Sequence, residues 1–420
     1  MLYLAHGVGR VFQSPLPLWL YLLGAAATVL ASFIVGARTR RTFPEHPARH
    51  VAGERAARVL AAALRAAGIA GLLLTFVAAV LLPVPGFSPA PLLFWVGLVL
   101  GTLAMSCVVA GVWEVADPWA AIEEVLGARQ AGGAPRLEAP VFVGPVLVYA
   151  LFWFELVSGV GFQPAAIVAV LLVYGLASLS LRGPLGEGWR LCDPFSILFG
   201  FAARIAALEL RRTAIYRRAR RGRRPMHPSL FASLFVLLAG TTLDNLRETV
   251  GWSEALAATG VAEGPRVLVE SIVLALLVVP FATLFSAAVW SARRALGDRR
   301  PIGELNRLFA WSLVPIAVAY ILAHNAPLAI TGAPTLLAQL SGGLVGSESL
   351  APSPGFVWSL EIVLIVGGHV LGVATAHRVA LALARPGGRV VTGEAVLTVL
   401  MCAFTVVTLW LLAQPLVAGG

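Results

Sequence analysis

The sequence has no lysine, little charge and few cysteines. All 31 basic residues are arginine, and charged residues make up only 12% of the 420-residue chain. The three cysteines, Cys107, Cys192 and Cys402, share no CxxC spacing, which argues against a disulfide framework or a thiolate zinc site. The chain also lacks the G-x-S-x-G, HExxH and Walker-type motifs of soluble enzymes. No polar stretch is long enough to form a separate soluble domain.

Long apolar runs dominate what is present. Hydrophobic residues make up 59% of the chain, and ~20 apolar residues at a helical rise of 1.5 Å span the hydrocarbon core of a bilayer. We therefore expect an all-α integral membrane protein, with residues 1–420 forming a single transmembrane domain of about ten helices. The expected spans are 18–37, 66–82, 91–112, 141–159, 163–181, 228–246, 266–290, 307–325, 355–379 and 394–414.

The net charge of +10 is explained by topology. Arginines gather in alternate loops, which the positive-inside rule places in the cytoplasm, so both termini are expected outside. This pattern predicts a multi-pass protein of a bacterial cytoplasmic membrane, with the lipid bilayer and not nucleic acid as its partner. The arginine-rich loops are 38–65, 211–224, 293–307 and 378–389, and the arginine-poor loops are 83–91, 158–163, 247–265 and 325–354.

Two expected cytoplasmic segments, 113–119 and 189–195, share the pattern W-x3-D-P-aromatic. Aspartate at an N-cap followed by proline at the first helical position starts a helix. We expect Asp117 and Asp193 to cap two amphipathic helices on the inner surface, at 120–126 and 196–210. A binding role for the two segments is the alternative, and they form a possible pseudo-repeat within the domain.

Several ionisable residues fall inside the apolar spans, where they normally face the bundle interior and have partners. The topology places five of them, from five helices, in the outer leaflet, with His369 deeper. Carboxylates and imidazoles suit a divalent transition metal such as zinc, manganese, iron or copper. The expected metal ligands are His324, His369, Glu361, Asp244 and His6, with Glu270 or Glu155 as a catalytic general base.

Each of these residues also has a structural interpretation. Glu155 and Glu270 can extend to the outer interface, and Asp244 can pair with Arg247 on the same helix face. His369 can bond a backbone carbonyl beside Gly367 and Gly368, where a neighbouring helix can approach closely. The Gly/Pro-rich stretch 326–353 is expected to fold over the outer face as a non-helical lid.

These residues lie in segments that resemble a family of polytopic membrane proteins, found largely in actinobacteria and often labelled fenitrothion hydrolase-like. The resemblance runs through Leu4-Ala-His6-Gly, the D-P-aromatic segments, the stretch Thr241–Trp252, Ala319-Tyr-Ile-Leu-Ala-His324 and Gly368-His369-Val-Leu-Gly372. It implies hydrolysis of organophosphate triesters.

The sequence thus leaves three functions open. The first is a metal-dependent hydrolase that acts on a small molecule through a site open to the outside. The second is a secondary transporter in which the same groups carry protons. The third is a metal- or haem-binding subunit of a membrane complex, so an oligomer or complex is a possible assembly.

Overall fold

The computed structural model describes residues 17–39, 49–50, 53–84, 86–125, 137–210, 224–258, 260, 263–342, 344, 353–384 and 389–413. The chain divides into two compact units. Unit 1 comprises Met1–Gly7, His46–Tyr216 and Pro327–Pro352, and unit 2 comprises Val8–Glu45, Arg217–Ala326 and Ser353–Gly420. Each unit contains several long apolar helices.

The helical, multi-pass character expected from the sequence is confirmed. Within the described ranges, eight helices are long and apolar enough to cross a membrane. A ninth span results if Ile302–Ser312 and Val314–His324, which are bent by 44° at Leu313, are counted together. The expected span at 141–159 forms a shorter apolar helix, Val143–Val157. The eight are Leu18–Arg38, Glu54–Leu81, Ala90–Val108, Pro164–Leu191, Pro228–Arg247, Pro265–Leu296, Gly355–Leu383 and Val390–Leu412.

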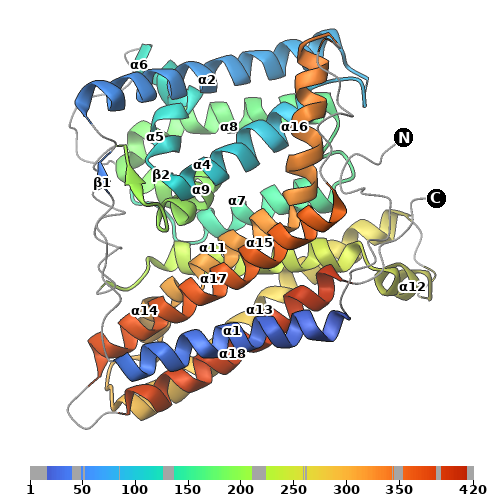
Figure 1. The fold of residues 1–420 in the computed structure, drawn as a ribbon. Coiled ribbons are helices and arrows are strands. Elements are labelled where there is room, and N and C mark those ends of the chain that lie inside the picture. The colour runs from blue at the N-terminus through green and yellow to red at the C-terminus, as the bar shows by residue number, and fades with distance from the viewer. Residues whose placement is uncertain are drawn as a thin grey trace. The chain divides into compact units, whose positions relative to one another are not determined.

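Unit 2 is a bundle of long helices around α17. Helix α17 packs against α15, α1 and α18, while α13 packs against α11 and α18 (Figure 1). A buried cluster of Ala25, Ala323, Ile365 and Leu409 joins four of these helices. The elements are α1 (Leu18–Thr39), α11 (Pro228–Arg247), α12 (Val250–Ala258), α13 (Glu263–Leu296), α14 (Ile302–Phe309), η4 (Ala310–Ser312), α15 (Val314–His324), α17 (Pro354–Leu383) and α18 (Val390–Leu412).

The contact between α15 and α17 depends on glycine. A Cβ added at Gly368 would lie 2.5 Å from the Ala319 Cβ and 2.8 Å from the Pro315 carbonyl oxygen. One turn further, a Cβ at Gly372 would lie 2.8 Å from the Ser312 carbonyl oxygen. The close helix approach predicted at Gly367 and Gly368 is therefore confirmed at Gly368, whereas a Cβ at Gly367 would meet nothing within 4 Å.

Unit 1 contains shorter and more irregular helices. It includes two π-helical segments, η1 and η2, and a parallel three-stranded sheet of two-residue strands in the order β1-β3-β2. The elements are β1 (Arg49–His50), α2 (Glu54–Leu81), α3 (Ala90–Leu92), η1 (Leu93–Gly101), α4 (Thr102–Val108), β2 (Val109–Ala110), α5 (Val112–Ala116), α6 (Pro118–Val125), α7 (Val143–Phe152), η2 (Trp153–Val157), α8 (Pro164–Leu185), η3 (Gly186–Leu191), α9 (Pro194–Ala203), β3 (Leu208–Glu209) and most of α16 (Ala326–Leu340).

Two expectations about unit 1 are wrong. The first half of the expected non-helical lid forms the helix α16, since its Ala- and Leu-rich sequence favours a helix despite Pro334. The helix after Asp193, α9, is buried at nearly every position and is not an amphipathic surface helix. Its residues Phe195, Phe199 and Phe201 carry apolar side chains to several faces, which is the pattern of a core helix.

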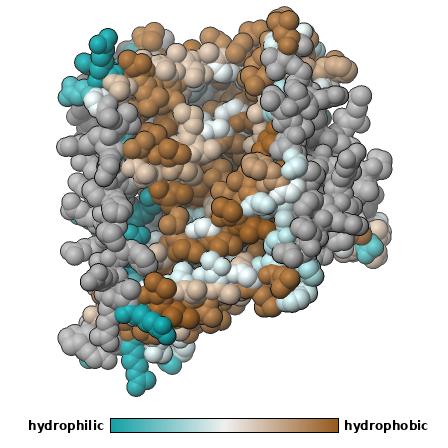
Figure 2. Space-filling model, in the orientation of Figure 1, coloured by the Kyte–Doolittle hydropathy of each residue, from teal (hydrophilic) through white to brown (hydrophobic). Residues whose placement is uncertain are grey.

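The outer surface of the helices is apolar. Large hydrophobic side chains such as Leu73, Val80, Leu276 and Val363 are more than half exposed. In Figure 2, brown hydrophobic residues cover most of the coloured surface on the face shown. Such a surface is unfavourable in water, so these helices contact lipid.

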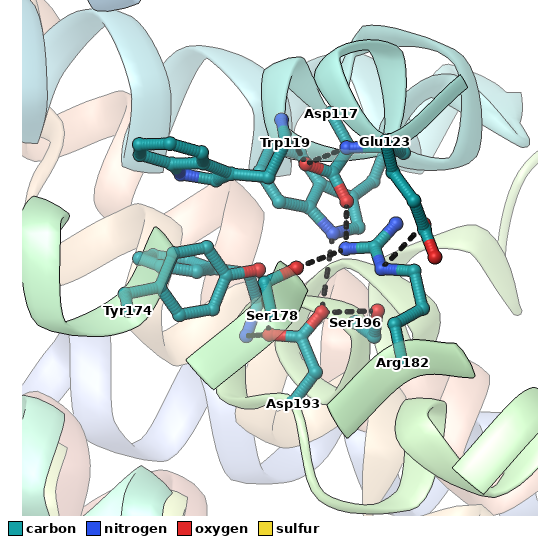
Figure 3. A network of polar contacts seen from close by, with 11 residues as sticks. Asp117, Trp119, Glu123, Tyr174, Ser178, Arg182, Asp193 and Ser196 are labelled. Atoms are coloured by element: carbon teal, nitrogen blue, oxygen red, sulfur yellow. Dashed lines mark hydrogen bonds and ion pairs between the residues drawn. The ribbon is translucent and has the colours of Figure 1, made fainter. Parts of the chain in front are cut away.

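The two D-P segments meet in a buried polar group that we call the unit 1 network (Figure 3). Asp117 Oδ1 accepts bonds from the backbone N–H groups of Trp119 and Ala120, and Asp193 Oδ1 accepts one from Phe195, which confirms both N-caps. The Arg182 guanidinium, from α8, binds Asp117 Oδ2 at 2.5 Å and lies 3.7 Å from the Glu123 carboxylate. The network therefore ties the starts of α6 and α9 to α8.

Asp193 receives further hydrogen bonds inside this network. The hydroxyl groups of Ser196 and Tyr174 donate to it over 2.5 and 3.1 Å, and the Trp113 indole N–H donates over 3.5 Å. The residue is fully buried, and its carboxyl pKa is raised from 3.8 to about 6, chiefly by burial, although the Ser196 hydrogen bond and the Arg182 charge lower it.

This raised pKa gives a pH-dependent contribution to stability. A folded-state pKa above the unfolded value means that the unfolded chain releases the Asp193 proton first, so stability falls as pH rises from about 4 to about 6. At 1.36 kcal/mol per pKa unit, the loss is about 3 kcal/mol. We expect Asp193→Asn, which cannot ionise, to gain stability relative to wild type between pH 4.5 and pH 7, measured by thermal unfolding in detergent. A constant difference between the two proteins would contradict this.

Two glycines of α2 provide a matched test of packing in unit 1. A Cβ at Gly68 would collide with the Ala116 carbonyl oxygen at the end of α5, whereas a Cβ at Gly71 meets nothing within 4 Å. We expect Gly68→Ala to destabilise unit 1 by about 1–3 kcal/mol through overpacking. Gly71→Ala should be neutral or stabilising by up to about 1 kcal/mol, since alanine favours the helix. Equal melting temperatures for the two variants would contradict the predicted contact.

Candidate metal site

The candidate site forms where two helices of unit 2 end. Asp244 lies in the last turn of α11, and Glu248 follows four residues later as its C-cap, so both project from the same side of the helix. His324 is the last residue of α15. Helix α11 is largely buried, which places its carboxylates inside the bundle and not at the lipid surface.

The three side chains converge closely enough to share an ion. His324 Nε2 lies 2.7 Å from Asp244 Oδ2, and one ligand atom from each of the three residues lies within 4.8 Å of the others. His324 and Asp244 are 3% and 4% exposed. The pKa of the Glu248 carboxyl is raised from 4.5 to about 7, because burial and the neighbouring Asp244 carboxylate raise it more than His324 and Arg247 lower it. We call Asp244, Glu248 and His324 the acidic triad.

A second layer of polar contacts holds the triad in place. The Asn245 side-chain amide donates to the Tyr320 hydroxyl over 2.8 Å and to the Thr241 carbonyl oxygen over 2.9 Å. Asn245 and Tyr320 are almost fully buried. Since Tyr320 lies one turn before His324 on α15, this bond fixes the two helix ends that carry the triad.

Glu361 approaches the same region from α17. Its side chain is buried, and its carboxylate interacts electrostatically with His324 and Glu248. The structure therefore brings together three residues that the sequence analysis selected, Asp244, His324 and Glu361. It adds Glu248, which was not among the expected ligands although the spacing Asp244-x3-Glu248 puts both carboxylates on one helix face.

Glu270 is held by other partners in unit 2. Arg247 Nε lies 3.0 Å from one of its oxygens, and Arg266 Nε lies 3.0 Å from the other. The Trp252 indole N–H donates to it over 3.4 Å. Both carboxylate oxygens are thus engaged by cations, an arrangement that suits a structural ion pair better than a general base.

His369 lies deeper along α17. Its Nδ1 is 2.8 Å from the Ile365 carbonyl oxygen of the same helix, as the structural interpretation predicted, and its Nε2 has no hydrogen-bond partner among the described residues. Eight residues separate it from Glu361, or ~12 Å along the helix, and it does not join the acidic triad.

Two selected residues remain. Glu155 belongs to η2 of unit 1, and His6 lies outside the described residues. Comparison with known protein families, with curated proteins and with solved structures gives no match to this chain. The function must therefore be inferred from the chemistry of the residues themselves.

Proposed function

We propose that this chain is an integral membrane metalloenzyme whose acidic triad holds a divalent transition metal and whose reaction is the hydrolysis of a small-molecule ester. One observation carries the proposal: two carboxylates and an imidazole place their ligand atoms within 4.8 Å of one another inside the bundle. Ligands ~2.1 Å from one ion in tetrahedral geometry are ~3.4 Å apart, so only small side-chain adjustments are needed.

The donor set fits catalytic chemistry. Nitrogen and oxygen ligands suit zinc, manganese, iron or copper, and three protein ligands leave a coordination position open for water. A metal bound there supplies Lewis acidity and lowers the pKa of a coordinated water toward neutrality. Asn245 and Tyr320 keep the two helix ends in register while the reaction proceeds.

Glu361 is the residue that we assign as general base. Its carboxylate interacts electrostatically with His324 and Glu248, and it belongs to a different helix, α17. It accepts a proton from the attacking water, whose oxygen forms a bond to the electrophilic centre as the bond to the leaving alkoxide or aryl oxide breaks. The resemblance to fenitrothion hydrolase-like proteins favours a phosphotriester as the substrate.

The test uses protein purified in detergent and supplied with each metal in turn. Fenitrothion is the substrate, and release of the coloured nitrophenolate measures hydrolysis. We expect turnover without any ion gradient, its loss on chelation, and its loss in Glu361→Gln with metal still bound. No turnover with any supplied metal would overturn the hydrolase proposal while leaving the metal site to be tested separately.

A second candidate function, proton-coupled transport, is favoured by another buried pair in unit 2. His377 Nδ1 lies 2.7 Å from Glu394 Oε2, and both side chains are almost fully buried. His377 Nε2, Glu394 Oε1 and His369 Nε2 have no hydrogen-bond partner among the described residues. His369 and His377 lie two turns apart on α17 and Glu394 lies on α18, and ionisable groups at successive depths are typical of proton pathways. Flux driven by a pH gradient in proteoliposomes, abolished by Glu394→Gln, would support this function.

A further inference from the structure

Unit 1 contains a cavity that the proposed reaction does not use. Its volume is about 250 Å³, and α2, η1, α4, α6 and α8 contribute to its walls. The lining is mostly apolar and includes the aromatic side chains of Trp113, Trp119, Tyr174 and Phe195. A cavity of this kind inside a membrane protein can hold the apolar part of a ligand.

Glycines on two helices leave room for this cavity. Gly71 on α2 and Gly97 on η1 both line the cavity, and neither carries a side chain to fill it. A Cβ at Gly71 would meet nothing within 4 Å. The π-helical turns of η1, from Leu93 to Gly101, form part of the same wall, and such turns occur frequently at functional sites.

Aromatic residues of this lining adjoin buried carboxylates. The Tyr174 hydroxyl and the Trp113 indole N–H both donate to Asp193, and Trp119 directly follows the Asp117-Pro118 pair. Figure 3 shows the rings of Trp119 and Tyr174 on the side of these carboxylates that faces away from Arg182.

The charges of the unit 1 network do not balance. It contains three buried carboxylates, Asp117, Glu123 and Asp193, and Arg182 is its single guanidinium among the described residues. Glu114 is matched separately by Arg190 at 3.4 Å. The network therefore holds two more carboxylates than guanidinium groups beside these aromatic rings, and ionised carboxylates there attract a cation to the ring faces.

We propose that this cavity binds an amphiphile with a compact cationic head group, such as an alkylammonium or quaternary ammonium compound. The head lies against Trp119 and Tyr174, and the chain occupies the apolar space between α2 and η1. A 150 Å³ apolar cavity holds benzene, so about 250 Å³ accommodates roughly ten heavy atoms of the ligand. An anionic head group is disfavoured by the same carboxylates that attract a cation.

The test uses the full chain, delipidated in detergent at pH 7.5, and native mass spectrometry. The probes are decyltrimethylammonium, decyl sulfate and decyl maltoside, which share one chain and differ in head group. We expect a single decyltrimethylammonium per chain to bind at least about tenfold more tightly than either of the others, a preference worth 1.4 kcal/mol. Equal binding of all three probes would overturn the cationic assignment.

Two variants locate the site. Gly71→Leu fills the cavity without a backbone clash, and we expect it to weaken decyltrimethylammonium binding about tenfold. Gly24→Leu on α1 of unit 2 is the matched control, since a Cβ there also meets nothing within 4 Å, and should leave binding unchanged. Unchanged binding in Gly71→Leu would place the probe elsewhere and overturn the proposal.

A charge variant separates electrostatic attraction from folding. Asp193→Asn keeps the side-chain shape and removes one buried negative charge. We expect it to reduce the preference for decyltrimethylammonium over decyl maltoside while leaving the affinity for decyl maltoside unchanged. An equal loss of affinity for both probes would indicate a structural effect and contradict the role of charge.

Discussion

Replacing Arg182 by glutamine is expected to destabilise the protein by about 3–5 kcal/mol, the usual cost of removing one partner from a buried ion pair. The Arg182 side chain is 19% exposed, and its partners Asp117 and Glu123 are 5% and 4% exposed. Without the guanidinium, both carboxylates remain in the interior with no cation in the unit 1 network. Thermal unfolding in detergent, followed by circular dichroism, measures the loss.

Arg65→Gln is the matched control for this prediction. Arg65 belongs to the same unit and pairs with Glu124 over 3.0 Å, but the two side chains are 38% and 49% exposed. Exposed pairs contribute about 0–1 kcal/mol. Similar melting temperatures for Arg182→Gln and Arg65→Gln would show that the buried network does not stabilise unit 1. Adding Asp117→Asn to Arg182→Gln should recover part of the loss, since one buried charge is removed with its partner.

Asp244→Asn is expected to reduce both metal affinity and hydrolysis by at least about 100-fold. Changes to residues that only support metal ligands already cost 10–100-fold, and Asp244 is itself a proposed ligand, 2.7 Å from His324 Nε2. Asparagine preserves the shape of the side chain, so the fold should persist. Titration with zinc or manganese, followed by the hydrolysis assay, measures the two losses on the same sample.

Asp298→Asn is the control for Asp244→Asn. Asp298 is a buried aspartate of the same unit, but it accepts a bond from the Arg300 backbone N–H and lies outside the acidic triad. Its replacement should leave metal affinity and turnover near the wild-type values. Equal losses in the two variants would attribute the effect to general destabilisation of unit 2.

Local signals in the sequence predicted several features correctly. Long apolar runs identified the membrane helices, because lipid requires ~20 apolar residues for each span. The D-P pairs predicted the N-caps at Asp117 and Asp193, since capping depends on adjacent residues. Asp244, His324 and Glu361 were predicted to share one site because their positions along their helices give similar depths, and the structure brings them into one region.

Features that depend on tertiary packing could not be predicted in this way. The position of a residue along a helix indicates its depth in the membrane but not the direction of its side chain. Depth alone therefore groups Glu270 and His369 with the site, although Glu270 pairs with arginines and His369 bonds the Ile365 carbonyl oxygen. The pairing of His377 with Glu394 joins two helices at positions that have no shared sequence signal. The burial of α9 likewise depends on the surrounding helices of unit 1.

The measurement that tests the proposed metal site most directly is the metal content of detergent-purified protein. It is determined by elemental mass spectrometry after expression in metal-supplemented medium. The comparison is wild type beside His324→Ala and His369→Ala. We expect about one transition-metal ion per chain in wild type and in His369→Ala. We expect none in His324→Ala, because His324 belongs to the acidic triad and His369 does not. Wild-type protein without metal, or His324→Ala protein with a full complement, would contradict the account.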